Sequence, residues 1–141
     1  MRRTLFVGLL FLFYVFLVGM GGLGGSASIN VPEPSRNYAA TITDQSDIAT
    51  RLEKFSLEGQ TAISGKLGGG HISIRFDKIA SVGFVLHDKT LEAEVLLKDG
   101  KTIPLVVDKE TACYGKLPYG EFKIAMEDIR SITIHGLVSG Q

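Results

Sequence analysis

A block of twenty residues occurs twice in this chain, fifty positions apart. Residues 65–84 read GKLGGGHISIRFDKIASVGF, residues 115–134 read GKLPYGEFKIAMEDIRSITI, and the two align without a gap. Seven of the twenty positions are identical: Gly65/Gly115, Lys66/Lys116, Leu67/Leu117, Gly70/Gly120, Ile74/Ile124, Ile79/Ile129 and Ser81/Ser131. Because units that share an apolar pattern bury the same face, the repeat predicts a domain built from two similar halves.

The apolar spacing inside the first block predicts its local structure. Ile72, Ile74 and Phe76 alternate, so they occupy one face of a strand. The apolar step then lengthens to three through Ile79 and Val82, which predicts a single helical turn before the next strand. The second block repeats this spacing with Phe122, Ile124, Met126, Ile129, Ile132 and Ile134.

Two acidic residues and two glycines in the blocks have structural interpretations. Asp77 and Glu127 stand where a carboxylate would favour the exposed N–H groups that open the helical turn. Gly70 and Gly120 directly precede the alternating strand and are interpreted as turn glycines. These four residues therefore need no catalytic explanation.

The segments outside the blocks carry hairpin patterns. Asp99-Gly100 lies between the apolar runs 95–97 and 102–107, as in a tight β-turn. Residues 38–43 and 48–55 resemble the matching hairpin of the first unit. Ile48, Leu52 and Phe55 also fit a helix at i, i+4 and i+7, but strand is preferred because the second unit reads as strand there.

Together these patterns predict an all-β fold. Two tandem units, about 38–86 and 91–135, yield about eight to ten short antiparallel strands, which is typical of a small barrel or sandwich. Each unit contains one helical turn between strands. A unit of under about 50 residues would be marginal alone, so residues 38–141 are expected to form a single domain with a shared core.

The N-terminus has the layout of a secretory signal peptide. Arg2 and Arg3 precede an apolar run over 5–18, and a Gly-rich stretch ends at Ala27, where cleavage is expected. The alternative is an uncleaved membrane anchor, because residues 5–23 contain no charge and approach the length of a bilayer-spanning helix. Either way the domain is expected outside the cytoplasm, periplasmic or extracellular, with residues 28–37 as an extended linker.

Composition argues against a nucleic-acid partner and excludes an internal disulfide. Loss of Arg2 and Arg3 with the signal peptide would leave 13 basic and 15 acidic residues, so no basic face for a nucleic-acid partner is expected. Cys113 is the single cysteine, which rules out an internal disulfide, and it is interpreted as a buried apolar thiol. No cofactor motif in a suitable context is found.

The three histidines are the remaining candidates for a metal site or a general base. His71, His87 and His135 have no other histidine or Cys113 within four residues, so a local zinc-type ligand pair is absent. Their convergence in space would be required for a metal-dependent or hydrolytic enzyme. They are otherwise expected to be surface residues.

A binding surface is predicted from what the two blocks do not share. Tyr114 and Tyr119 flank the second GKL motif, where the first block has Ser64 and Gly69, and Lys116 lies between them. Tyrosine and lysine on an ordered loop can bind a glycan, a peptide or a protein. The alternative is that Tyr119 packs over the neighbouring hairpin.

The sequence therefore predicts an exported, non-enzymatic β module that binds a protein or a cell-envelope component. A self-associating structural subunit of the envelope, and so a homo-oligomer, is one alternative. An enzyme that uses the three histidines is the other.

Overall fold

A computed structural model describes residues 29–139, and its compact domain begins at Val31. The predicted signal peptide (1–27) and its apolar segment (5–23) lie outside the described residues. Within residues 29–139 no helix has the length and apolar character needed to cross a membrane.

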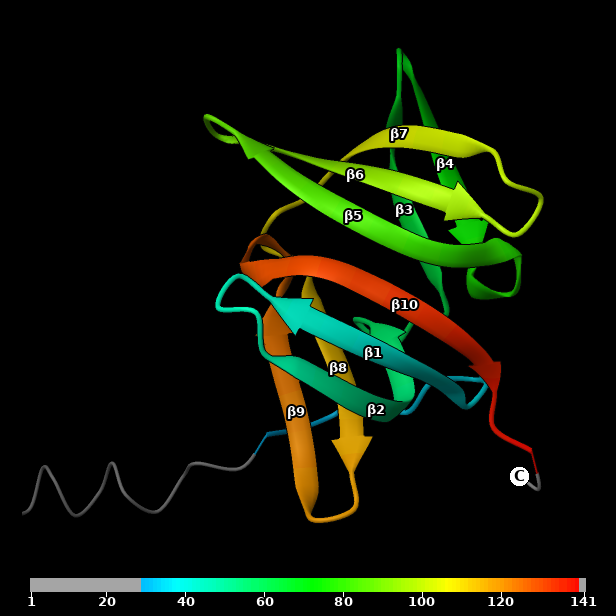
Figure 1. Ribbon diagram of the computed structural model, residues 1–141, viewed down its shortest axis with the longest axis vertical. Coiled ribbons are helices and arrows are strands. Elements are labelled where there is room, and N and C mark those ends of the chain that lie inside the picture. Colours follow the sequence, from blue (N-terminus) through cyan, green and yellow to red (C-terminus); the bar gives the residue numbers. More distant parts are fainter. Residues whose placement is uncertain (1–28, 140–141) are drawn as a thin grey trace, which may run out of the picture. The chain divides into compact units, whose positions relative to one another are not determined.

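The domain is a single antiparallel sheet of ten strands that curls into a half-barrel (Figure 1). Its strands are β1 (Tyr38–Asp44), β2 (Ala49–Leu57), β3 (Ala62–Leu67), β4 (Gly70–Arg75), β5 (Ile79–His87), β6 (Thr90–Leu97), β7 (Thr102–Val107), β8 (Ala112–Leu117), β9 (Gly120–Ala125) and β10 (Ile129–Leu137). Two 3-10 turns, η1 (Phe76–Lys78) and η2 (Met126–Asp128), are the helical elements of the described chain. The all-β prediction, with a barrel-like arrangement of antiparallel strands, is confirmed.

The strand order places the two matched blocks in corresponding positions. The sheet runs β4-β3-β7-β6-β5-β10-β1-β2-β8-β9, so β3 to β5 lie in one half and β8 to β10 in the other. The halves meet where Val82 of β5 faces Ile132 of β10, which are equivalent positions of the two blocks.

The first hairpin does not lie beside the block that follows it in the sequence. β1 pairs with β10, and β2 pairs with β8, so the N-terminal hairpin closes onto the C-terminal strands. β6 and β7 similarly complete the half that contains β3 to β5. Each half of the sheet therefore combines one block with a hairpin from the other predicted unit. β6 and β7, from unit 91–135, lie with the first block, and β1 and β2, from unit 38–86, lie with the second.

β2 is a strand, and the helical alternative for residues 47–55 is wrong. Leu52 and Phe55 are both fully buried although they are three residues apart. A shift in the β2–β8 register between Glu53 and Ser56 explains this spacing, because a bulge turns the later side chains inward. Lys54, inside the bulge, has a φ of 49°.

The helical turns occur at the predicted places, but their N–H groups are satisfied differently. Neither turn has a side-chain capping bond, and Asp77 instead lies 3.4 Å from the Nε of Arg75. The backbone carbonyls of Thr61 and Thr111 accept the N–H groups of Phe76 and Met126, at 3.0 and 2.8 Å. Thr61 and Thr111 directly precede β3 and β8. Because their carbonyls already accept the first N–H group of each turn, no carboxylate is needed to cap it.

The turn role predicted for Gly70 and Gly120 is also wrong. Both residues begin strands, and the left-handed backbone conformation in the first of these hairpins belongs to Gly68, with a φ of 60°. The second hairpin turns through Pro118 and Tyr119 without a left-handed residue.

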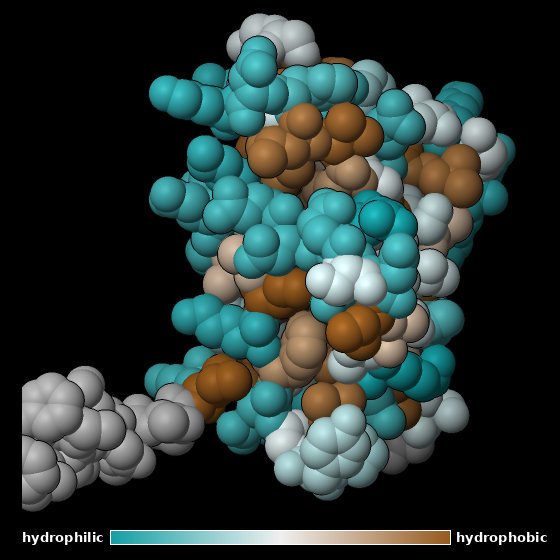
Figure 2. Space-filling view, turned by 60° about the vertical axis from the view of Figure 1, so that its left-hand side comes forward, coloured by the Kyte–Doolittle hydropathy of each residue, from teal (hydrophilic) through white to brown (hydrophobic). Residues whose placement is uncertain are grey.

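The core fills the concave side of the sheet. Phe76 of η1 stacks on Phe55 with ring centroids 5.3 Å apart and meets Tyr38 edge-on at 5.5 Å. Burying one such side chain contributes about 1.5–3 kcal/mol. The face drawn in Figure 2 is largely hydrophilic, and its apolar side chains form separate small groups.

Candidate functional site

The predicted binding residues lie on the β8–β9 hairpin. Tyr114 and Lys116 alternate with the buried Gly115 on β8, so both project from the convex face. Tyr119 stands in the two-residue turn and is 85% exposed, so it does not pack over a neighbouring hairpin. An aromatic ring at a hairpin tip can contact a partner without rearrangement of the backbone.

The segment before β1 packs on this face. Glu33 accepts a hydrogen bond from the Nζ of Lys54 at 2.7 Å, and its other carboxylate oxygen lies 3.7 Å from the Nζ of Lys116. The Lys54 hydrogen bond, together with the charges of both lysines, holds the pKa of the Glu33 carboxyl below its usual range. Residues 33 and 37, within the segment predicted to be a linker, therefore have ordered contacts with β2 and β8.

Asn37 connects this segment to β2 and to the residue that follows β10. Its Oδ1 accepts the backbone N–H of Lys54 at 2.7 Å, and its carbonyl accepts the N–H of Val138 at 2.9 Å. The first bond stabilises the left-handed conformation of Lys54, which a non-glycine residue adopts at a cost of order 1 kcal/mol or more. Strained residues of this kind cluster at functional sites, which draws attention to the surface around Lys54.

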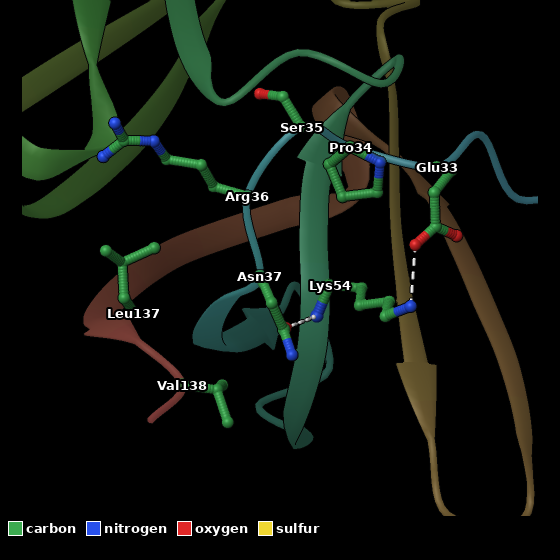
Figure 3. A pocket seen from close by; sticks show the side chains of 8 residues that line it. All are labelled: Glu33, Pro34, Ser35, Arg36, Asn37, Lys54, Leu137 and Val138. Carbon is green, nitrogen blue, oxygen red and sulfur yellow. Dashed lines mark hydrogen bonds and ion pairs between the residues drawn. The ribbon is translucent and has the colours of Figure 1, made fainter. Parts of the chain in front are cut away.

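Two hollows flank Lys54. One, of about 370 Å³, is lined by residues 33–37, Lys54, Leu137 and Val138 (Figure 3). The second, also about 370 Å³, is lined by Asn37, Glu53, Lys54, Lys116, Leu117 and Pro118. Pro118 precedes Tyr119 in the β8–β9 turn. Figure 3 shows Glu33 and Lys54 pointing toward one another, and Arg36 extending along the opposite side of the segment.

We call Lys54, Lys116, Tyr114 and Tyr119, with Glu33 between the lysines, the hairpin surface. It offers ammonium groups, a carboxylate and two phenol rings, which suits recognition of a polar or charged partner by hydrogen bonds and stacking. Its lining contains neither histidine nor cysteine.

The three histidines do not form a cluster. His71 lies on the edge strand β4, His87 ends β5 with its Nε2 3.9 Å from Glu92, and His135 on β10 has its Nε2 2.7 Å from the Oγ1 of Thr41. Within residues 29–139 no three histidine, cysteine, aspartate or glutamate side chains are placed to hold a metal ion. In that part of the chain the histidines do not make the convergent site that an enzyme of the predicted kind requires.

The contributions of Glu33, Asn37 and Lys54 were not foreseen from the sequence. The interval of three between Leu52 and Phe55 was a usable indication of a bulge, although it also fits a helix. Nothing local indicates that residues 31–37 reach β2 and β8, because those contacts join segments that are distant along the chain.

Comparison with curated proteins and with solved structures finds no match to this chain. A protein-family model described as "Uncharacterised protein" matches residues 34–136, which run from the segment packed on β2 and β8 nearly to the end of β10, and the chain belongs to that family.

Proposed function

We propose that this chain is an exported, non-enzymatic β module that binds a protein or another component of the cell envelope through the hairpin surface. Export would depend on residues 1–27, either cleaved after Ala27 or retained as an anchor through residues 5–23. The domain would then act in the periplasm or outside the cell.

The observation that carries the proposal is the exposure of Tyr119. A ring that is 85% exposed at a hairpin tip contributes little to the stability of its own domain. The corresponding tip between β3 and β4 is Gly68-Gly69, so the fold itself does not need an aromatic residue in this turn. Tyrosine buries a large area on binding and loses few rotatable bonds, which makes it effective at interfaces.

The halves of the domain support a further part of the proposal. We infer that residues 38–86 and 91–135 are two copies of one ancestral unit, since equivalent residues form equivalent contacts. The Lys98 N–H bonds the Lys78 carbonyl, and the Gln45 N–H bonds the Asp128 carbonyl, both at 3.0 Å. On this view a scaffold of two similar halves carries a binding surface on one half alone.

Capture of envelope components tests the binding function. The protein, expressed from Met1 with a C-terminal affinity tag, is cross-linked in intact cells, and captured components are compared between wild type and Tyr119→Ala. We expect Tyr119→Ala to lower capture about tenfold or more, since tyrosines at the centre of interfaces contribute about 2 kcal/mol or more. Its melting temperature should be nearly that of wild type.

Ile48→Ala is the matched control. Ile48 is also a large exposed apolar residue in a turn region, 60% exposed, but it lies between β1 and β2. It should leave capture unchanged. Equal capture by wild type and Tyr119→Ala, or equal losses for both variants, would refute the role of the hairpin surface.

A further inference from the structure

The strand β9 forms a free edge of the sheet. It pairs with β8 through six residue pairs, from Leu117↔Gly120 to Ala112↔Ala125, and no strand of the described chain covers its other side. In an antiparallel ladder the backbone groups of alternate residues point to opposite neighbours. The outer side of β9 therefore presents unpaired N–H and C=O groups at every second residue, a template for another strand.

Charged side chains on the convex face alternate in sign from β2 across β8 to β9. On the convex face Glu53 is opposite Lys116, and Lys116 is opposite Glu121. Lys123 lies two residues beyond Glu121 on the same face, with its Nζ 5.7 Å from the centre of the Tyr114 ring. Glu121 and Lys123 are both exposed, and neither forms an ion pair with another described residue.

We propose that two copies of this chain associate edge to edge through β9, antiparallel, with Phe122 of each copy on the two-fold axis. In this register Glu121 of each copy faces Lys123 of the other, which creates two cross-strand ion pairs. The half-buried Phe122 side chains face each other and extend both cores across the junction.

The chemistry of the edge selects this register. The outward backbone groups belong to every second residue of β9. When β9 pairs with β9 of another copy, an odd-numbered residue can therefore face only an odd-numbered one, and an even-numbered residue only an even-numbered one. The two neighbouring registers are centred on Glu121 or on Lys123. In the first, Glu121 of one copy faces Glu121 of the other, and in the second, Lys123 faces Lys123. Like charges in directly opposed positions are destabilising, so the register centred on Phe122 is the favourable one.

The other free edge, β4, is a poorer partner. It carries His71, Ser73 and Arg75 on its convex face, and no antiparallel pairing of β4 with itself joins opposite charges. Pairing β4 with β9 of another copy gains only Arg75 opposite Glu121, and Arg75 already lies 3.4 Å from Asp77. Two ion pairs and a Phe122 pair therefore favour the β9–β9 dimer over an open chain of β4–β9 contacts.

Charge exchange tests the proposal. The protein, expressed from Met1 and purified, is examined by sedimentation velocity up to its solubility limit, where wild type should show a monomer–dimer equilibrium. Glu121→Lys and Lys123→Glu each oppose like charges twice, and each should raise the dissociation constant about tenfold or more. The double variant, Glu121→Lys with Lys123→Glu, restores both ion pairs and should restore dimerisation.

Arg75→Glu, on the β4 edge, is the control and should leave the dissociation constant unchanged. A wild-type protein that stays monomeric throughout overturns the proposal. So does a double variant no better than the single ones, or a loss of association in Arg75→Glu equal to that in Glu121→Lys.

Disulfide trapping tests the register separately. Phe122→Cys places two thiols directly opposite one another, at a Cα separation within the range for a disulfide. Oxidation with diamide should give a covalent dimer from Phe122→Cys and none from Ile72→Cys, its equivalent on β4. Cys113 is fully buried and should add no background. Trapping of Ile72→Cys in preference to Phe122→Cys would refute the β9 interface.

Discussion

Gly115 should be one of the positions least tolerant of a methyl group. A Cβ built on Gly115 would lie 2.7 Å from both the Cβ and the Cδ1 of Leu52 and 3.0 Å from its Cγ. Favourable carbon contacts are at about 3.5–4.0 Å, so Gly115→Ala creates an overlap of about 0.8 Å. Leu52 is fully buried, and it can yield only if its side chain leaves a favourable rotamer or if β8 moves away from β2.

The expected cost follows from these contacts. Overpacking of a filled core costs about 1–3 kcal/mol, whereas exchange of glycine for alanine stabilises by about 0.4–1 kcal/mol through the unfolded chain. Gly115→Ala should therefore lower the free energy of unfolding by about 1–2 kcal/mol. For a domain of this size that corresponds to a fall of about 4–8 °C in melting temperature.

Chemical and thermal unfolding, followed by circular dichroism, measures the effect. Gly83→Ala is the control, because Gly83 lies within β5, has no left-handed φ, and a Cβ there would meet nothing within 4 Å. It should be neutral or slightly stabilising. Gly65→Ala should behave like Gly115→Ala, since its Cβ would lie 2.8 Å from the carbonyl oxygen of Val106. If Gly115→Ala were as stable as Gly83→Ala, the close approach of β8 to β2 would be refuted.

Two further predictions concern ionisable groups. Burial raises the pKa of the Cys113 thiol to about 12, above 9.0 for an unperturbed thiol, so the unfolded chain loses this proton first. The stability that this group contributes should be present below pH 9 and should fall by roughly 3 kcal/mol by pH 11. Urea titrations of wild type and of Cys113→Ala, which should lack this component, check the prediction. An identical pH dependence in both proteins would contradict it. The Lys54 hydrogen bond lowers the pKa of Glu33 below 4.5, so its contribution is present above that pH and is lost as the pH falls through the lower folded value. The stability difference between wild type and Glu33→Gln should therefore shrink in acid, and thermal melts from neutral to acid pH that show a constant difference would rule this out.

Alternation along the chain was sufficient to predict the class of fold. Ile72, Ile74 and Phe76 share a face because successive residues of a strand point to opposite sides, and the step of three to Ile79 marks η1. The exposure of Tyr119 could not be predicted in the same way, since a two-residue turn fits either a packed or a free ring.

The amino-acid sequence by itself determined the all-β class and the places of the two helical turns, because each of these depends on side chains a few residues apart. Only the tertiary structure decided which strands became neighbours: β1 beside β10, β2 beside β8, and β4 and β9 left as edges. Those pairings bring Leu52 against Gly115 and Glu33 between Lys54 and Lys116, and they leave Glu121 and Lys123 on an open edge. They depend on the registers in which distant segments bury their apolar faces together, and no local pattern in the chain specifies them.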